Sequence, residues 1–253
     1  MLCYNVSEGK NMKTIDFTNI DSTSLYLKRN YQEIENFTFV SSLYQSQGKG
    51  RNVRKWESEP GKNLLFSLII KDKEVIEKFT SLSLISAYCI YNVIKSLNIE
   101  HISIKWPNDV YIKDKKVCGI LLEGISCNNE LLAIVIGVGL NVNQQEFATA
   151  NATSLYLNSQ IEYQLNEIKQ KVYQEFIKQI DLFKNGCSQY LSVVKENNYL
   201  KDKQVYATYN GNKIEVKVLD INDDNSLKVL YNNTVLSLNS GEISFHLQDR
   251  EAY

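Results

Sequence analysis

A loop that combines glycines with cationic side chains is the first place in this chain where residue types suggest chemistry. Residues 45–56 read Gln-Ser-Gln-Gly-Lys-Gly-Arg-Asn-Val-Arg-Lys-Trp. Glycine lets backbone N–H groups approach a ligand closely, lysine and arginine supply charge for a carboxylate or phosphate, and a tryptophan can cover a planar ring. The pattern therefore predicts that the loop binds a ligand in which an anion is attached to a flat group, for example a nucleotide. The residues concerned are Gly48, Lys49, Gly50, Arg51, Arg54, Lys55 and Trp56.

Taken alone, this loop is also typical of a solvated connection between two strands. It lacks the G-x-x-x-x-G-K-[ST] spacing of a P-loop. It also lacks the third glycine of the dinucleotide-binding fingerprint. The loop therefore becomes diagnostic only in combination with other motifs.

Four further motifs accompany the loop, and each has an ordinary structural interpretation. Residues 22–24 (Ser-Thr-Ser) suit the N-cap of a helix. Residues 105–109 (Lys-Trp-Pro-Asn-Asp) suit a turn, and residues 116–123 (Lys-Val-Cys-Gly-Ile-Leu-Leu-Glu) suit a strand with a solvated lysine at its start. Residues 137–141 (Gly-Val-Gly-Leu-Asn) suit a bulge at a strand end, or a backbone surface on which a flat ligand can lie.

In their order along the chain, the five motifs resemble those of the biotin protein ligases (biotin–acetyl-CoA-carboxylase ligases). The family pattern is a Ser-Thr-Asn triad, a Gly-Arg-Gly-Arg-type loop that ends at Trp, Lys-Trp-Pro-Asn-Asp, Lys-x-x-Gly-Ile-Leu and Gly-x-Gly-x-Asn. The resemblance extends from about residue 14 to residue 245, which is nearly the whole chain.

This resemblance implies that biotin and ATP, with Mg²⁺, form biotinyl-5′-AMP, and that biotin then passes to a lysine of a biotin carboxyl carrier protein. The first step brings a carboxylate to a phosphate, and two unit charges about 4 Å apart repel by about 4 kcal/mol in a partly screened site. Fixed cations offset that repulsion. By resemblance these are Lys49, Arg51 and Lys116, while Asp109 positions the ribose and phosphates or the incoming lysine. The resemblance implies no metal site built from protein ligands.

The resemblance also assigns residues to each substrate. The residues expected to bind biotin are Ser22, Thr23, Ser24, Gln45, Gly48, Lys49, Gly50, Arg51, Lys116, Gly119, Gly137 and Gly139. By resemblance, Trp56 would stack on the adenine, and Asn141 would hydrogen-bond to the edge of the adenine ring. The full set expected to bind ATP or the adenylate is Arg51, Arg54, Trp56, Lys105, Asn108, Lys116 and Asn141.

The chain departs from the family pattern at three places. Ser24 stands where the family usually has Asn, and Lys49 stands where it has Arg, so the charge is kept but the bidentate fork is lost. Asn52 and Val53 replace an Arg/Gln-Gly pair. We expect substrate binding to survive these changes, with altered retention of the adenylate.

The elements that must position these motifs follow from hydrophobic periodicity. Apolar residues at spacings of three or four predict helices over 73–97 and 163–184, and a third helix follows the cap at residues 21–22. Strands are predicted at 14–17, 37–43, 63–70, 102–106, 109–112, 116–124 and 131–137. The resemblance implies an α+β fold, with a class II synthetase-like biotin/lipoate ligase catalytic domain (a mixed sheet with helices) over residues 1–200.

From about residue 201, short alternating apolar runs are separated by turn signals, which predicts four or five antiparallel strands. By resemblance, residues 201–253 form a small SH3-like β-barrel. Only 21 residues precede Ser22, which is too few for the DNA-binding domain of some family members. We therefore expect a monofunctional ligase.

Composition limits the other function classes. The 28 Lys and Arg residues nearly balance the 29 Asp and Glu residues, so no overall field attracts nucleic acid or membranes. Five scattered cysteines without a C-x-x-C pair favour a reducing cytoplasm over disulfides or zinc. Residues 1–13 are polar, so we expect no signal peptide. The sequence has no run of 18 apolar residues. We expect a cytoplasmic monomer or homodimer.

Two alternatives stay open at this stage. A lipoate or octanoate protein ligase would share the fold, although those relatives lack the pairing of this basic loop with Lys-Trp-Pro-Asn-Asp. A nucleic-acid-binding protein that uses the basic loop would belong to a different class, and the balanced net charge argues against it.

Overall fold

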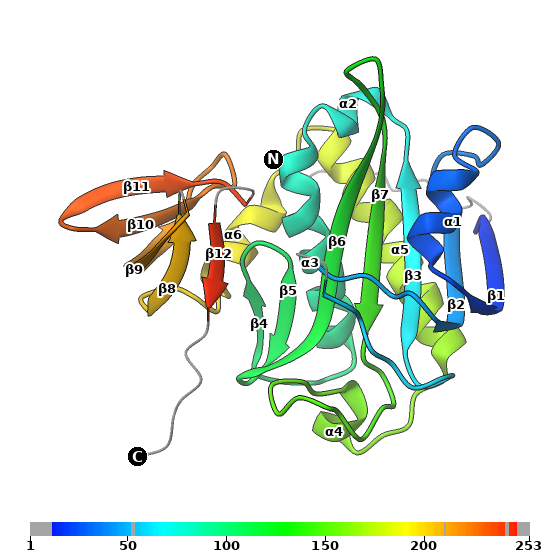
Figure 1. Cartoon of the computed structure of the whole chain (residues 1–253). Coiled ribbons are helices and arrows are strands. Elements are labelled where there is room, and N and C mark those ends of the chain that lie inside the picture. Colours follow the sequence, from blue (N-terminus) through cyan, green and yellow to red (C-terminus); the bar gives the residue numbers. More distant parts are fainter. Residues whose placement is uncertain (1–11, 52–53, 210, 241–242, 247–253) are drawn as a thin grey trace.

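A seven-stranded mixed sheet forms the centre of the molecule (Figure 1). The computed structural model describes residues 12–51, 54–209, 211–240 and 243–246. The strand order is β1-β2-β3-β7-β6-β5-β4, in which β1 and β2 pair in parallel and the other neighbours are antiparallel. The strands are β1 (Thr14–Ile20), β2 (Phe39–Gln45), β3 (Leu64–Ile70), β4 (Ile102–Lys105), β5 (Asp109–Ile112), β6 (Lys115–Cys127) and β7 (Glu130–Leu140).

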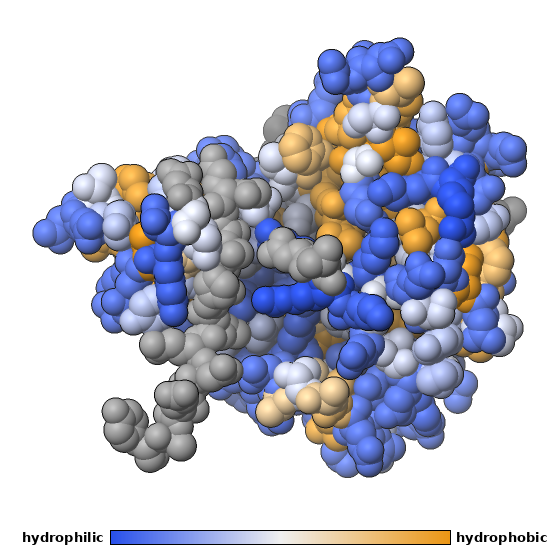
Figure 2. All heavy atoms as spheres, in the orientation of Figure 1, coloured by the Kyte–Doolittle hydropathy of each residue, from blue (hydrophilic) through white to orange (hydrophobic). Residues whose placement is uncertain are grey.

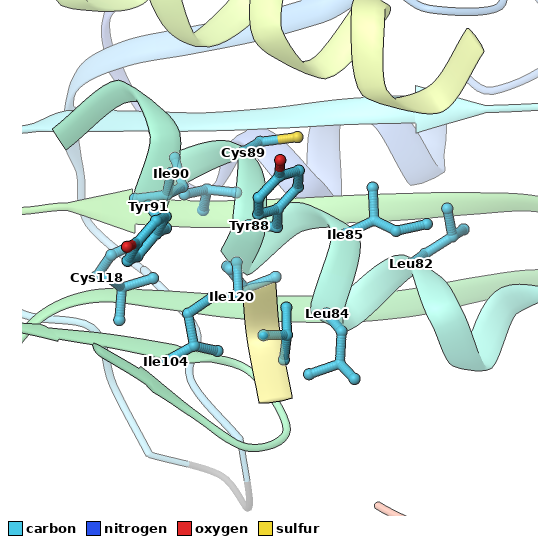
Figure 3. Packing of buried hydrophobic residues seen from close by; sticks show 14 of the residues in the cluster. Leu82, Leu84, Ile85, Tyr88, Cys89, Ile90, Tyr91, Ile104, Cys118 and Ile120 are labelled. Carbon is cyan, nitrogen blue, oxygen red and sulfur yellow. The ribbon is translucent and has the colours of Figure 1, made fainter. Parts of the chain in front are cut away.

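Helices cover one face of this sheet (Figure 1). The main ones are α3 (Phe79–Ser96) and α5 (Leu165–Lys184), with α2 (Lys73–Ile76), α4 (Leu155–Ser159) and α6 (Gln189–Glu196) around them. The largest core cluster lies between these helices and the sheet. Figure 3 shows side chains of α3 meeting Ile104, Cys118 and Ile120 of the sheet. Burial of apolar area at this interface supplies the main driving force for folding.

The opposite face of the sheet is covered only in part, by α1 (Thr23–Arg29). Leu27 of α1 packs against Val40, Ile69 and Val135, which alternate along their strands with residues of the main core. Because successive side chains of a strand point to opposite faces, this alternation separates a second, smaller apolar cluster from the first. The rest of this face is available for a binding site.

The C-terminal part forms a separate five-stranded sheet of order β11-β10-β9-β8-β12. It lies beside α6 and the β4–β5 edge of the larger sheet (Figure 1). The assignment of residues 201–253 to an SH3-like domain stays a prediction, whereas the predicted small β-sheet is present. Its strands are β8 (Gln204–Tyr209), β9 (Asn212–Ile221), β10 (Leu227–Tyr231), β11 (Thr234–Leu238) and β12 (Ile243–His246).

The predicted α+β class with a mixed sheet is confirmed, but several boundaries were wrong. The single helix expected over 73–97 is two helices, because α2 ends at Ile76 and α3 begins at Phe79. The expected strand 131–137 continues to Leu140, so the glycines at 137 and 139 lie inside β7 and not at its end. Apolar periodicity did not reveal α4 or α6, because both are short. Within the described residues, no helix has the length and apolar character needed to cross a membrane.

The aromatic cluster under the sheet generates a stability prediction. Phe176 of α5 is 1% exposed and meets the ring of Phe66 edge-on at 5.8 Å, whereas Phe79 at the start of α3 is 50% exposed. We expect Phe176→Ala to lower the free energy of unfolding by about 3–5 kcal/mol, since it leaves a cavity in the core. Phe79→Ala should change it by no more than about 0.5 kcal/mol. Denaturant unfolding of both variants checks this, and similar losses would contradict the described packing.

Candidate active site

Strand register aligns residues from three of the sequence motifs in one row across the sheet. Gly139 of β7 pairs with Gly119 of β6, Gly119 pairs with Asp109 of β5, and Asp109 pairs with Lys105 of β4. Residues directly opposite each other on neighbouring strands project to the same face. The Lys-Trp-Pro-Asn-Asp, Lys-x-x-Gly and Gly-x-Gly motifs therefore meet on the open face of the sheet, next to α1.

The two glycines of this row form a floor on which Trp56 lies. A Cβ atom at Gly139 would come within 2.3 Å of the Trp56 indole, and one at Gly119 would come within 2.8 Å. Glycine is thus required at both positions because the ring contacts the backbone itself. A ligand ring that stacks on Trp56 must lie on the other face of the indole or lift it from the floor.

A cavity of about 620 Å³ opens above this floor. In Figure 2, hydrophilic side chains gather around the middle of the same face. Of the predicted site residues, those that line the cavity are Ser22, Thr23, Ser24, Gln45, Lys49, Gly50, Arg51, Arg54, Trp56, Lys105, Asn108, Asp109, Lys116, Gly119, Gly137, Gly139 and Asn141. Gly48 instead lines an adjoining cavity of about 770 Å³ under the loop. Asn52 and Val53 lie outside the described residues.

The basic loop after β2 folds back on itself and crosses the sheet face in front of β7 and β6 (Figure 1). Trp56 N–H donates to Gly48 O (3.0 Å), and Gly50 N–H donates to Arg54 O (2.7 Å). A Cβ atom at Gly48 would lie 2.7 Å from the Trp56 carbonyl oxygen, so the two arms of the loop approach too closely for a side chain there. This pairing holds the cationic residues of the loop over the cavity.

Cationic side chains predominate on the β4–β6 side of the cavity. Lys116 Nζ lies 2.8 Å from Asp109 Oδ1, and it also lies over the Trp56 ring, 5.5 Å from its centroid. Arg51 donates through Nη1 to Asn108 Oδ1 (3.2 Å), and burial lowers the pKa of its guanidinium against the opposing effect of Asp109. This side of the cavity suits an anionic ligand.

Lys105 is the most strongly perturbed of these cations. It is 9% exposed, and its ammonium lies 3.4 Å from the Tyr111 hydroxyl oxygen. Burial lowers its pKa to about 8, with Asp109 acting in the opposite direction and Lys116 adding to the lowering. Removing a lysine from water disfavours its charged form unless a partner compensates. An anionic ligand would be such a partner.

Neutral polar groups occupy the α1 side of the cavity. Gln45 Oε1 accepts from Thr23 N–H (2.7 Å) and from the Thr23 hydroxyl (3.0 Å). Ser67 Oγ lies 2.7 Å from Thr23 Oγ1 and 2.9 Å from Ser24 Oγ. A Cβ atom at Gly137 would lie 2.7 Å from Ser24 Oγ, so glycine there gives the hydroxyl its space. The result is a buried hydroxyl and amide cluster beside apolar walls.

Ser67 is a site residue that the sequence interpretation missed. It interrupts the apolar run Leu-Leu-Phe-Ser-Leu-Ile-Ile of β3, and that interruption was the available signal. The cavity is also lined by residues 147–149 and by Gln144, which no motif indicated. Their neighbour Asn151 accepts from Lys116 N–H through its carbonyl oxygen (2.8 Å). This second loop therefore lies beside the cationic side of the cavity.

Asn141 contributes an unsatisfied acceptor to the cavity. Its Nδ2 donates to Thr153 O (2.9 Å), whereas its Oδ1 is buried without a partner within the described part of the chain. Buried polar atoms are usually hydrogen-bonded, so an orphan acceptor in a cavity marks a place for a ligand donor. No group of three or more His, Cys, Asp or Glu side chains that could hold a metal occurs among the described residues.

Comparisons with known proteins agree with this geometry. Residues 15–141, half of the chain, match the biotin/lipoate A/B protein ligase family. The bifunctional ligase/repressor BirA of Escherichia coli is 30% identical over 177 residues, which is 68% of this chain and 55% of that protein. The biotin–[acetyl-CoA-carboxylase] ligase of Paracoccus denitrificans is 28% identical over 124 residues, or 48% of this chain and 51% of that protein. The chain thus spans about half the length of these curated relatives.

A solved structure covers more of the fold. The biotin protein ligase from Aquifex aeolicus, in complex with biotin and ATP, superposes with a TM-score of 0.83 at 26% identity. The match includes 92% of this chain and 98% of that chain. It therefore extends over both sheets.

The lowered pKa of Lys105 generates a pH prediction. Its ammonium loses charge as pH rises through about 8, so the attraction for a phosphate is present below this pH and is lost above it. With ATP as the anionic probe, we expect the affinity to fall about tenfold between pH of about 7 and about 9. In Lys105→Met the affinity should be weak and nearly independent of pH over that range. Titration calorimetry with the exposed-lysine variant Lys113→Met as control checks this, and a pH-independent wild type would contradict it.

Proposed function

Because this chain belongs to the biotin/lipoate A/B protein ligase family, we propose that it joins biotin to ATP as biotinyl-5′-AMP. We further propose that it transfers the biotin to a lysine of a biotin carboxyl carrier protein. The observation that carries this proposal is the division of one cavity into a neutral polar side and a cationic side. A ligand with a polar head and a carboxylate tail can span the two sides.

The neutral side suits the ureido ring of biotin, which offers one carbonyl acceptor and two N–H donors. Hydroxyl and amide groups can both donate and accept hydrogen bonds. Ser22, Thr23, Ser24 and Gln45 are the proposed partners, and Ser67 joins them through its bonds to Thr23 and Ser24. Gly137 leaves room for the Ser24 hydroxyl among them.

The cationic side suits the triphosphate and the adenine. The orphan Oδ1 of Asn141 can accept from the adenine amino group, and the Trp56 indole offers a stacking surface. Arg51, Arg54 and Lys105 line the same side and are proposed to bind the phosphates. Asn108 supports this arrangement, because its side chain accepts from Arg51 and donates to Ile120 O (2.7 Å).

In the first step the biotin carboxylate attacks the α-phosphorus of ATP, a new O–P bond forms, and the bond to pyrophosphate breaks. The carboxylate is already ionised, so no general base is needed. Lys116, Arg51 and Lys49 offset the repulsion between the two anions and stabilise the charge that develops. Asp109 holds the Lys116 ammonium at 2.8 Å and so fixes its position.

Mg²⁺ carried by ATP would supply positive charge for the pyrophosphate leaving group. Phosphate oxygens and water would hold this ion, and the carboxylates that line the cavity are Asp109 and Glu57. In the second step the acceptor amine attacks the acyl carbon, an amide bond forms, and AMP leaves. Asp109 is proposed to orient that amine.

The same cavity favours biotin over lipoate or octanoate. The dithiolane and alkyl ends of those acids offer no hydrogen-bonding partner to the cluster of Thr23, Ser24, Ser67 and Gln45, whereas the ureido ring of biotin offers donors and an acceptor. The expected cytoplasmic location, and the monomeric or homodimeric state, remain proposals. Binding of nucleic acid by the basic loop is disfavoured by the net charge of −1.

The proposed function predicts a change in the mass of an acceptor protein. The protein is incubated with biotin, MgATP and a biotin carboxyl carrier domain, and the acceptor is examined by mass spectrometry. We expect its mass to rise by one biotinyl group in the presence of ATP and to stay unchanged without ATP or with lipoate in place of biotin. An unmodified acceptor, beside a control ligase that modifies it, would refute the proposal.

A further inference from the structure

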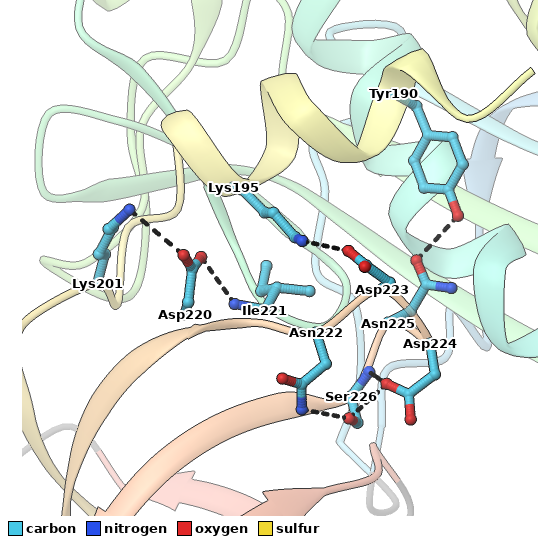
Figure 4. Close-up of polar contacts among 10 residues, drawn as sticks. All are labelled: Tyr190, Lys195, Lys201, Asp220, Ile221, Asn222, Asp223, Asp224, Asn225 and Ser226. Atoms are coloured by element: carbon cyan, nitrogen blue, oxygen red, sulfur yellow. Dashed lines mark hydrogen bonds and ion pairs between the residues drawn. The ribbon is translucent and has the colours of Figure 1, made fainter.

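Asn225, at the turn between β9 and β10, joins the C-terminal sheet to three segments of the larger unit. Its Oδ1 accepts from the Tyr190 hydroxyl of α6 (2.9 Å), and its Nδ2 donates to Ser81 Oγ of α3 (3.0 Å). Its backbone carbonyl accepts from the indole N–H of Trp106 (2.9 Å). Figure 4 shows Tyr190 pointing at Asn225 from α6. One residue thus makes both side-chain bonds and a backbone bond across the interface.

The turn itself is held in a fixed shape. Asp224 accepts from the backbone N–H of Ser226 (2.9 Å) and from its hydroxyl (2.5 Å), as Figure 4 shows. Asn225 has a φ of +69°, in the left-handed region that asparagine and glycine tolerate best. The two side-chain bonds of Asn225 then fix the direction of its carbonyl oxygen. That oxygen is the acceptor for Trp106.

Trp106 connects the C-terminal sheet to residues of the active-site cavity. It is 2% exposed and precedes Pro107, Asn108 and Asp109 in the chain. The Pro107 carbonyl oxygen accepts from Ser83 Oγ (2.7 Å), two residues beyond the serine that bonds to Asn225. The first turns of α3 therefore hold both the hairpin and the Trp-Pro-Asn segment.

The segment from Trp106 to Asp109 contacts cationic residues on one side of the cavity. Asn108 accepts from Arg51 (3.2 Å), and Asp109 is 2.8 Å from Lys116. The C-terminal sheet makes a second contact there, because Arg51 Nη2 donates to Ser240 O (2.8 Å). The neutral side of the cavity has its own support, since Thr23 and Ser24 bond to Ser67 of β3.

We propose that Asn225 is a positioning residue for ATP: through Trp106 it sets the place of Asn108 and Asp109, and hence of Arg51 and Lys116. It touches no substrate. The inference rests on the proposed function, because it names the nucleotide side of the same cavity. It predicts that loss of the Asn225 side chain impairs reaction with ATP far more than binding of biotin, whose ring is held on the independently supported neutral side.

The test compares two glycine substitutions at left-handed asparagines of the same sheet. Asn225→Gly keeps the backbone conformation and removes the bonds to Tyr190 and Ser81. Asn233→Gly, at the β10–β11 turn with φ +60°, makes the same change at an exposed site. We expect Asn225→Gly to lower kcat/KM for ATP in biotinyl-AMP formation about tenfold, because small misplacements of binding groups are costly. The Kd for biotin should stay within about twofold, and Asn233→Gly should match the wild type in both measurements.

Asn225→Asp provides the rescue. Its carboxylate can accept from Tyr190 and also from the Ser81 hydroxyl, so we expect most of the ATP-dependent rate to return. Equal rates for Asn225→Gly and wild type overturn the inference, and so does an equal loss of biotin affinity, which would indicate general destabilisation. A wild type that forms no biotinyl-AMP refutes the proposed function instead, and is thereby distinguished from failure of the positioning role.

Discussion

The register of the central strands is the constraint on which the site depends. One cross-strand row runs from Leu65 through Gly139, Gly119 and Asp109 to Lys105. A slip of one residue in any pair would turn one part of this row to the helix-covered face. The buried core fixes the register, since the alternate residues of β7 and β6 pack against α3 and α5. Packing on the helix-covered face of the sheet thus determines which residues project into the cavity on the other face.

Charge is concentrated where that row meets the basic loop. Lys105 and Arg51 are partly removed from water, which lowers the pKa of both, and Asp109 opposes that effect for each. Burial of several cations together raises the free energy of the protein without ligand, and a bound anion offsets this cost. The C-terminal sheet supports this side of the cavity, with Asn225 bonded to Trp106 and Ser240 bonded to Arg51.

The sequence was sufficient for the parts of the site that consist of local motifs. The glycine floor, the basic loop and the Lys105–Asp109 segment were recognised because their residue types occur together within a few positions. Ser67 was missed because a single serine in an apolar strand is a weak local signal, and its role depends on Thr23 and Ser24 from another element. The bond between Asn225 and Trp106 spans 119 positions and follows only from the packing of two sheets. The boundaries within 73–97 and at the end of β7 depend likewise on tertiary contacts, which override periodicity.

The proposed function requires fixed cations that allow two anions to react, and Lys116 is the cation whose removal tests this requirement. Formation of biotinyl-AMP is measured for Lys116→Met and for Lys115→Met, whose lysine is the exposed neighbour on the same strand. We expect Lys116→Met to lose about a hundredfold or more in rate, the order found when a single stabilising donor is removed from a preorganised site. Lys115→Met should retain the wild-type rate. A Lys116→Met variant that forms biotinyl-AMP as fast as Lys115→Met would show that this fixed cation is not needed for the reaction.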